Sequence, residues 1–165
     1  MEHDQTRQKE LLPPTQAIVV RGLPGTGKTT LTNRIAELLR FDGHKVMHIN
    51  ADAVRASLNS DLGFDEASRV ENARRLGCVA LLARMNGLIP VVDFVMPTLE
   101  TNTAFKTGFQ SNRFTLWRVK RGPDFKCRFS DTDQMFQNSL FGIDLHYTLP
   151  DVDRIAREVI EASRS

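Results

Sequence analysis

The residues best suited to do chemistry lie in one short stretch, residues 17–30. There an apolar run is followed by the pattern Gly-x-x-x-x-Gly-Lys-Thr and then at once by a helical pattern. Glycines in such a loop adopt backbone angles closed to other residues, which lets main-chain N–H groups approach a phosphate. The helix start that follows points unpaired N–H groups and the positive end of its dipole at the same anion. The stretch therefore predicts a loop that binds a nucleoside triphosphate.

Each position of this loop has an expected role in binding ATP and Mg²⁺. The ammonium of Lys28 is expected to reach the β- and γ-phosphates, and the hydroxyl of Thr29 is expected to ligate Mg²⁺. The other positions shape the loop and offer backbone groups. The residues predicted to bind the nucleotide are Gly22, Pro24, Gly25, Thr26, Gly27, Lys28, Thr29 and Thr30.

Two carboxylates follow apolar runs and are candidates for the same site. Asp52 comes just after a short apolar stretch, at the point that faces the γ-phosphate in a fold of this kind. It could orient an acceptor hydroxyl or hold Mg²⁺ through water, or it could be the N-cap of the helix that follows. Asp93 ends the apolar run 88–93 and resembles the aspartate of the second nucleotide motif, which binds the Mg²⁺ shell. A capping or loop aspartate is the alternative.

Four arginines and one phenylalanine are candidates for the acceptor side. Arginine suits phosphate or sulfate because its planar fork makes paired hydrogen bonds, although arginines on helices are commonly solvated. Phe64 follows a glycine in a loop, where its ring could stack on a base or plug the core. The arginines are Arg55, Arg69, Arg74 and Arg75.

The stretch 113–128 combines basic and aromatic residues. It holds six basic residues against one acid, Asp124, with Trp117 and Phe125 among them. This pattern could track a nucleic-acid strand, could form a flexible lid that closes over the triphosphate, or could be a solvated loop. Arg128 is our catalytic candidate from this loop. A nucleic acid is the second choice of partner, after a small-molecule acceptor.

Hydrophobic periodicity predicts strands alternating with helices. We expect strands near residues 17–21, 45–49, 88–95, 114–119 and 143–149, and helices near 31–42, 53–58, 65–86, 98–108 and 151–162. Pro90 should delay pairing of the third strand, and residues 120–138 should be irregular. This alternation predicts a three-layer α/β/α fold around a five-stranded, mostly parallel sheet, with ligands at the carboxyl ends of the strands.

Composition narrows the class of protein. The 165 residues suit one domain, and 22 basic against 20 acidic residues give a net charge too small to indicate a nucleic-acid or membrane partner. No stretch approaches the ~18 apolar residues of a membrane span. Two distant cysteines fit a reducing compartment, so we expect a cytoplasmic protein without membrane contact. His44, His48 and His146 form no metal-binding pattern.

Several motifs together resemble the adenylylsulfate kinase family. Asn50-Ala51-Asp52-Ala53-Val54-Arg55 is similar to that family's Asp-Gly-Asp-Asn-Val-Arg segment. Leu58-Asn59-x-Asp61-Leu62-Gly63-Phe64 is similar to its Asn-x-Asp-Leu-Gly-Phe loop, and the run from Arg69 to Arg75 to its Arg-x-Glu-Asn-x-Arg-Arg helix. Phe94-Val95-Met96-Pro97 corresponds to its Phe-Ile-Ser-Pro. The likeness is close from Ile18 to about Pro97.

The resemblance implies a P-loop kinase domain over residues 17–165. The polar stretch 1–16, which contains Pro13-Pro14, is expected to be a flexible tail before that domain. The activity implied is transfer of the ATP γ-phosphate to the 3′-hydroxyl of adenosine 5′-phosphosulfate, with homodimers common in the family. Asp52 would match the aspartate near the acceptor hydroxyl and Mg²⁺. The residues that would match the acceptor site are Arg55, Phe64, Arg69, Asn72 and Phe94.

The chain also departs from the family pattern. Asn50 replaces an aspartate, Asp93 stands where a small polar residue is usual, and the family's lysine-containing lid has no clear match in residues 121–137. The second adenine-stacking aromatic would fall at Leu140, unless Phe141 takes its place. The alternatives are therefore a related kinase acting on another small-molecule or nucleic-acid hydroxyl, and a nucleotide-binding regulatory protein without catalysis.

Overall fold

The structure, a computed structural model, describes residues 17–120, 125–137, 141–146 and 149–164. The tail 1–16 lies outside the described residues, as do Leu140 and residues 147–148 of the expected last strand. The strands are β1 (Ala17–Arg21), β2 (Val46–Asn50), β3 (Ile89–Phe94), β4 (Phe114–Lys120) and β5 (Ile143–His146). The helices are α1 (Lys28–Phe41), α2 (Ala51–Ala56), α3 (Glu66–Met85), α4 (Leu99–Phe109), α5 (Ser130–Gln137) and α6 (Val152–Ala162), with a 3₁₀ turn at Leu149–Asp151.

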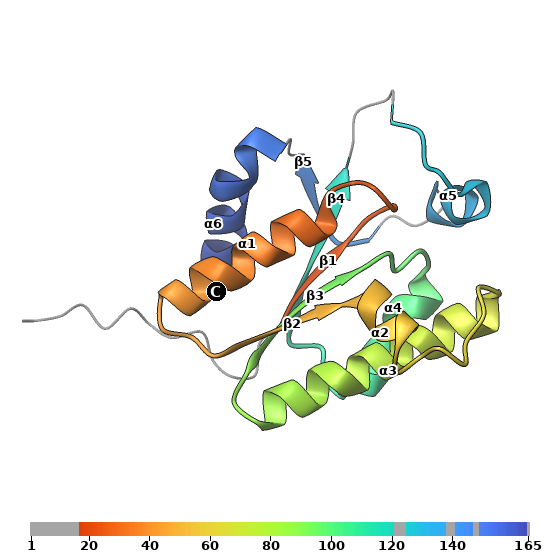
Figure 1. Ribbon diagram of the computed structural model, residues 1–165, viewed down its shortest axis with the longest axis horizontal. Coiled ribbons are helices and arrows are strands. Elements are labelled where there is room, and N and C mark those ends of the chain that lie inside the picture. The colour runs from red at the N-terminus through yellow and green to blue at the C-terminus, as the bar shows by residue number, and fades with distance from the viewer. Residues whose placement is uncertain (1–16, 121–124, 138–140, 147–148, 165) are drawn as a thin grey trace, which may run out of the picture.

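The five strands form one sheet in the order β2-β3-β1-β4-β5, and every described pairing is parallel. β1 lies in the middle, and its five residues are all buried, as expected for a strand covered on both faces. Figure 1 shows α1 and α6 together on one face of the sheet, and α3 and α4 on the other. The predicted three-layer α/β/α fold is confirmed.

Two cores hold the layers together. One lies between the sheet and α1 and α6, and includes Ile18, Leu31 and Val159. The other lies between the sheet and α3 and α4, and includes Leu76 and Phe105. Among the described helices, none has both the length and the apolar character that crossing a membrane requires.

The start of β3 differs from the expectation. Pro90 lies inside the strand, opposite Met47 of β2, and Ile89 N–H donates to the carbonyl oxygen of Lys45 at 2.8 Å. The prediction that pairing begins only after Pro90 is therefore wrong. The reason lies in the register: the pairing of β3 with β1 begins one residue later, at Val91 opposite Ile18, so the missing N–H of Pro90 falls before that ladder starts.

Helix α5 was also not expected, because residues 120–138 were predicted to be irregular. It spans eight residues and has Asp131 and Asp133 in its first turn, where carboxylates suit the helix dipole. Figure 1 shows that α5 lies beyond the carboxyl ends of β1 and β3. The fold therefore places a short helix next to the edge where ligands of parallel sheets bind.

Helices α3 and α4 approach each other through two glycines. A Cβ atom on Gly108 would lie 2.0 Å from the carbonyl oxygen of Arg74, and one on Gly77 would lie 2.2 Å from that of Phe105. No real side chain fits such a space, so both positions require glycine for packing. This close approach fixes α3, which carries Arg69 and Asn72, against α4.

Candidate active site

The loop between β1 and α1 has the conformation that phosphate binding requires. Gly25 and Gly27 have φ angles of 81° and 88°, in the left-handed region that favours glycine. A Cβ on Gly22 would lie 2.9 Å from the Thr26 hydroxyl and 3.1 Å from the Val119 carbonyl oxygen, so this position also needs glycine. Gly27 then serves as the N-cap of α1, which directs the helix N-terminus at the loop.

Lys28 is buried at the base of this loop. Its Nζ donates to the Leu23 carbonyl oxygen at 2.9 Å, and the Thr26 hydroxyl donates to the same oxygen at 2.8 Å. Burial lowers the pKa of Lys28 to about 8, although Asp93 and Asp52 act in the opposite direction. The nearby carboxylates therefore do not fully compensate the cost of burying the ammonium. A bound phosphate would supply further negative charge to stabilise it.

Asp93 is the centre of a buried polar cluster at the carboxyl ends of β2 and β3. Its Oδ1 accepts from Asn50 Nδ2 at 2.8 Å and from the Thr29 hydroxyl at 3.2 Å. Its Oδ2 accepts from the Thr32 hydroxyl at 2.9 Å and lies 2.8 Å from His48 Nε2. The alternative of a loop or capping aspartate is wrong, because Asp93 lies within β3 and is only 3% exposed.

Asp52 lies in the first turn of α2 and is exposed to the cavity described below. The N-cap of α2 is Asn50, whose Oδ1 accepts from Ala53 N–H at 2.8 Å. The alternative interpretation of Asp52 as the helix cap is therefore wrong. Its carboxylate is left facing the same space as Lys28 and Thr29, so it could interact with an acceptor hydroxyl.

A single cavity of about 1060 Å³ joins the phosphate loop, the start of α2, the loop before α3 and the start of α5. Thirteen of the predicted site residues line it. They are Pro24, Gly25, Gly27, Lys28, Thr29, Thr30, Asp52, Arg55, Phe64, Arg69, Asn72, Asp93 and Phe94. Gly22 and Thr26 lie next to each other within the phosphate loop and are not among the described residues that line the cavity. Arg128 is exposed and does not line the cavity either.

Arg55, Phe64 and Arg69, which are predicted to bind the acceptor, line the cavity together. Arg55 Nη1 donates to the Gly63 carbonyl oxygen at 2.6 Å, and its guanidinium lies 4.5 Å from the centre of the Phe64 ring. Arg69 Nε donates to the Phe64 carbonyl oxygen at 2.7 Å. Phe64 is 67% exposed, so the alternative of a core plug is wrong and its ring is available for stacking. Burial, followed by the charge of Arg69, lowers the pKa of Arg55.

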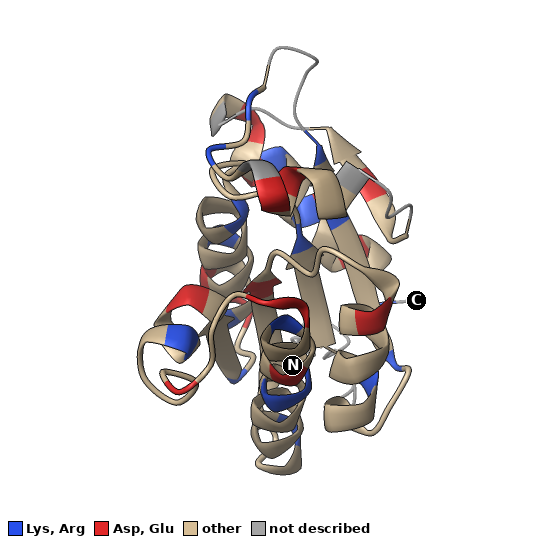
Figure 2. Cartoon of the chain, turned by 90° about the vertical axis from the view of Figure 1, so that its right-hand side faces the viewer, with Lys and Arg blue, Asp and Glu red and all other residues tan. Residues whose placement is uncertain are grey.

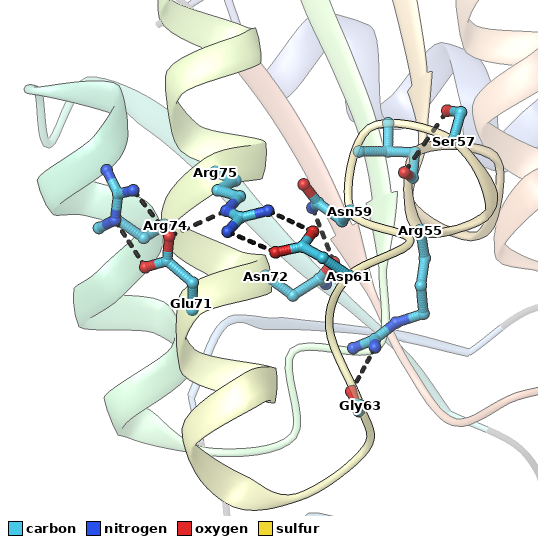
Figure 3. Close-up of polar contacts among 10 residues, drawn as sticks. Arg55, Ser57, Asn59, Asp61, Gly63, Glu71, Asn72, Arg74 and Arg75 are labelled. Atoms are coloured by element: carbon cyan, nitrogen blue, oxygen red, sulfur yellow. Dashed lines mark hydrogen bonds and ion pairs between the residues drawn. The ribbon is translucent and has the colours of Figure 1, made fainter.

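The other two arginines of this region have a structural role instead. Figure 3 shows Arg75 between two carboxylates: it donates to both oxygens of Asp61, at 2.7 and 2.9 Å, and to Glu71 at 2.9 Å. Arg74 makes a paired contact with Glu71, with both distances 2.8 Å. Arg75 therefore ties the loop that carries Asp61 to α3, whereas Arg74 bonds within α3. Neither arginine is among the described residues that line the cavity.

Asn72 links the same loop to α3 from the buried side. Its Oδ1 accepts from Asn59 Nδ2 at 2.9 Å, and both residues are almost fully buried. Figure 3 shows this pair beside the Arg75–Asp61 contact. The loop that presents Phe64 is thus held at two points, which fixes this wall of the cavity.

Helix α5 covers this end of the cavity, and sequence reasoning missed its contribution. Phe129, Asp131 and Thr132 line the cavity. Arg69 Nη2 lies 3.3 Å from Asp131 Oδ2 and donates to the Thr132 hydroxyl at 3.2 Å. The run of hydroxyl and acidic residues from 130 to 133 is a typical helix start, and this signal could have predicted the helix.

The described part of the basic stretch, residues 113–120 and 125–128, does not present its basic and aromatic side chains as one exposed track. Trp117 and Arg118 are buried within β4. Arg118 pairs with Asp144 at 2.5 Å, and Lys120 contacts the same carboxylate at 3.0 Å. Figure 2, which views the molecule from the side that carries α5, shows acidic and basic segments interleaved. The nucleic-acid partner has no support from this arrangement.

Phe141 packs beneath α5. Its ring lies 3.7 Å from the guanidinium of Arg21, with Phe136 of α5 at 4.3 Å from the same group. Arg21 is fully buried and donates to the carbonyl oxygens of Phe141 and Met96, at 2.8 and 3.0 Å. Burial, followed by the charge of neighbouring Arg118, lowers the pKa of Arg21 to about 9. Arg21 thus joins the end of β1, just before the phosphate loop, to α5.

The fold and the cavity define a class of protein, a three-layer α/β/α protein with a P-loop that opens into a large cavity. The chain belongs to the adenylylsulphate kinase family, whose model matches residues 15–153. It is 30% identical over 141 residues to a probable adenylyl-sulfate kinase of Bacillus subtilis, an alignment covering 81% of this chain and 71% of that protein.

Other relatives agree with this assignment. The bifunctional enzyme NodQ of Azospirillum brasilense is 34% identical over 141 residues, which cover 81% of this chain and 23% of NodQ. The chain thus spans about a quarter of the length of this relative. A solved Mycobacterium tuberculosis APS kinase superposes with a TM-score of 0.69 at 27% identity, covering 93% of this chain and all of that one. A Sinorhizobium meliloti gluconokinase shares the fold alone, at 14% identity and a TM-score of 0.64.

Proposed function

We propose that this protein transfers the γ-phosphoryl group of ATP to the 3′-hydroxyl of adenosine 5′-phosphosulfate. The observation that carries the proposal is the single cavity, which has the phosphate loop at one end and Arg55, Phe64 and Arg69 at the other. Family membership supports the same activity. A solved relative from Mycobacterium tuberculosis is an APS kinase in complex with AMPPNP and APS.

The nucleotide end holds the triphosphate and its cation. Lys28 and the loop N–H groups stabilise charge on the transferring phosphoryl group. Mg²⁺ prefers oxygen ligands, and the Thr29 hydroxyl and Asp93 carboxylate, 3.2 Å apart, provide them, so the donor set fits this ion. Asp52 is a further oxygen donor in the same cavity. When bound, Mg²⁺ would neutralise the negative charge of the phosphate groups.

The acceptor end binds the second nucleotide. Arg55 and Arg69 pair with its phosphosulfate, because guanidinium groups match oxyanions with two hydrogen bonds. The exposed ring of Phe64 stacks on its adenine. Asn72 and Phe94 complete the wall of this end of the cavity.

Asp52 acts on the reacting hydroxyl. It orients the 3′-hydroxyl and accepts its proton as the oxygen attacks the γ-phosphorus. A new P–O bond forms on the acceptor while the bond to the β,γ-bridging oxygen breaks, and that oxygen leaves with the electron pair as ADP. Arg128 remains a prediction as the lid residue that closes over ATP, since it is exposed in this structure.

The test measures ADP release from Mg·ATP with and without adenosine 5′-phosphosulfate, together with the mass of the product. Acceptor-dependent ADP release and a mass gain of one phosphate are expected. Lys28→Ala should remain folded and lose about 10²–10³ in rate, as for other charge-stabilising groups. ATP binding without acceptor-dependent release would reject this acceptor, and other nucleotides would then be screened.

Self-association and a cytoplasmic location also stay predictions. An APS kinase of Thiobacillus denitrificans, 25% identical with a TM-score of 0.68, is hexameric. We propose a homodimer for this chain, which light scattering on the purified protein would test. A monomer at micromolar concentration would reject it.

A further inference from the structure

His48 lies on β2, directly behind the carboxylate that we assign to the Mg²⁺ site. Its Nε2 is 2.8 Å from Asp93 Oδ2 and 2.9 Å from the Thr32 hydroxyl oxygen. The strand register explains this position, because His48 pairs with Val91 and Asn50 pairs with Asp93, so residues 48 and 50 approach the same carboxylate. The His48 side chain is 16% exposed and that of Asp93 is 4% exposed.

The chemistry of the pair fixes the position of one proton. An ionised carboxylate can only accept hydrogen bonds, so the contact with Asp93 Oδ2 requires His48 to carry a proton on Nε2. The Thr32 hydroxyl has the carbonyl oxygens of Lys28 and Thr29 within 3.0 and 3.2 Å as further acceptors. Because Thr32 has one hydroxyl proton and several acceptors, Asp93 Oδ2 depends on the Nε2–H of His48 as a donor.

The two oxygens of Asp93 have separate partners. Oδ2 is bound by His48 and the fully buried Thr32, whereas Oδ1 is bound by Asn50 and Thr29 on the cavity side. A carboxylate held at both oxygens cannot rotate about its Cβ–Cγ bond without losing donors. Loss of the rear donor would free this rotation and leave a buried oxygen short of a partner, which is costly.

We propose that His48 is a positioning residue for metal-nucleotide binding: its Nε2–H holds Asp93 so that Oδ1 stays directed at the Thr29 hydroxyl. Such outer-shell donors orient a ligand, and their loss typically costs about 10–100-fold in metal affinity or activity. The proposal rests on the proposed function only through the Mg²⁺·ATP site. It is independent of which acceptor the enzyme phosphorylates.

Two substitutions separate a positioning role from a purely structural one. In His48→Gln the amide nitrogen falls near the place of Nε2, so the donor to Asp93 is retained. In His48→Asn the shorter amide cannot reach Asp93, although size and polarity change little. His146→Asn, an exposed histidine on β5 that does not line the described cavity, is the matched control.

The experiment measures Mn²⁺ binding to the protein–ATP complex by electron paramagnetic resonance, with no acceptor present, and the melting temperature of each variant. His48→Asn should weaken Mn²⁺ binding by about 10-fold or more, while His48→Gln and His146→Asn stay within about threefold of wild type. Equal Mn²⁺ affinity in His48→Asn and His48→Gln would overturn the proposal.

A second measurement covers the case in which His48→Asn does not fold. Long-range ¹H–¹⁵N spectra of the wild-type protein should show the His48 proton on Nε2, and Asp93→Asn should shift that resonance. A proton on Nδ1 alone would overturn the proposal. Because neither measurement uses an acceptor, a wrong choice of acceptor would leave both results unchanged and would appear only in the ADP-release assay.

Discussion

Arg69 of α3 lies 3.3 Å from Asp131 of α5, so a carboxylate on the helix that covers the cavity is paired with an arginine of the acceptor site. The Arg69 side chain is 12% exposed and that of Asp131 is 70% exposed. An anionic acceptor that binds Arg69 must therefore compete with Asp131 or move it aside. Under the proposed function, α5 therefore takes part in acceptor binding as well as covering the cavity.

Asp131→Asn should strengthen acceptor binding. An exposed ion pair is weak, so we expect the KM for the acceptor to fall by about two- to fivefold while the KM for ATP is unchanged. Steady-state kinetics with each substrate varied in turn would measure this. Asp133→Asn, on the same helix but not lining the described cavity, should leave both constants unchanged. A higher acceptor KM in Asp131→Asn would mean that Asp131 binds the acceptor directly.

Phe64→Leu should weaken acceptor binding without destabilising the fold. The ring is 67% exposed, so its loss removes little buried surface. Stacking of a base on an aromatic ring is worth about 1–3 kcal/mol, and the acceptor KM should rise about tenfold or more. The control is Phe41→Leu, at the exposed end of α1. An unchanged acceptor KM in Phe64→Leu would place the adenine elsewhere.

Local patterns predicted the fold and the nucleotide end of the site well. The glycine loop and the helix that follows it are contiguous in sequence, and the structure has the predicted five strands with bounds within a few residues. Phe64 and Asp52 were placed in the cavity by position relative to strand ends, which parallel sheets bring to one edge. These features were predictable because they depend on short-range sequence patterns and on the rule that parallel strands end at the same edge of a sheet.

The remaining features depend on which residues face each other across elements. The contact of His48 with Asp93 follows from the β2–β3 register, and that of Arg69 with Asp131 joins residues 62 positions apart. Neither contact can be predicted from the spacing of residues within a single helix or strand. Likewise, Arg75 resembles an acceptor-binding arginine by sequence, but its contacts with Asp61 and Glu71 turn it into a loop anchor.

Lys28 should take up a proton when ATP binds above neutral pH. Burial holds its pKa at about 8, below the ordinary value of 10.5, so at pH 9 most nucleotide-free molecules have a neutral Lys28. A bound phosphate favours the ammonium and raises this pKa, so binding recruits a proton and affinity falls by up to about tenfold per pH unit above 8.

Calorimetry of ATP binding at pH 9, in buffers that differ in ionisation enthalpy, would count these protons. Lys28→Arg is the control, because a guanidinium stays protonated at this pH and should take up no proton. Equal proton uptake by wild type and Lys28→Arg would show that another group titrates. Below pH 7 Lys28 is already protonated in the nucleotide-free protein, so proton uptake by Lys28 should vanish in wild type as well.

Gly108→Ala should destabilise the protein and disturb the acceptor site at the same time. In an isolated helix alanine is favoured over glycine by about 1 kcal/mol, but here its Cβ would lie 2.0 Å from the Arg74 carbonyl oxygen. Separation of α3 from α4 should then lower the free energy of unfolding by about 1–3 kcal/mol or more. Because α3 carries Arg69 and Asn72, the acceptor KM should also rise.

Denaturant unfolding would measure the loss of stability in Gly108→Ala, with Thr107→Ala on the exposed face of α4 as control. A Gly108→Ala protein as stable as wild type would contradict the close packing of these helices.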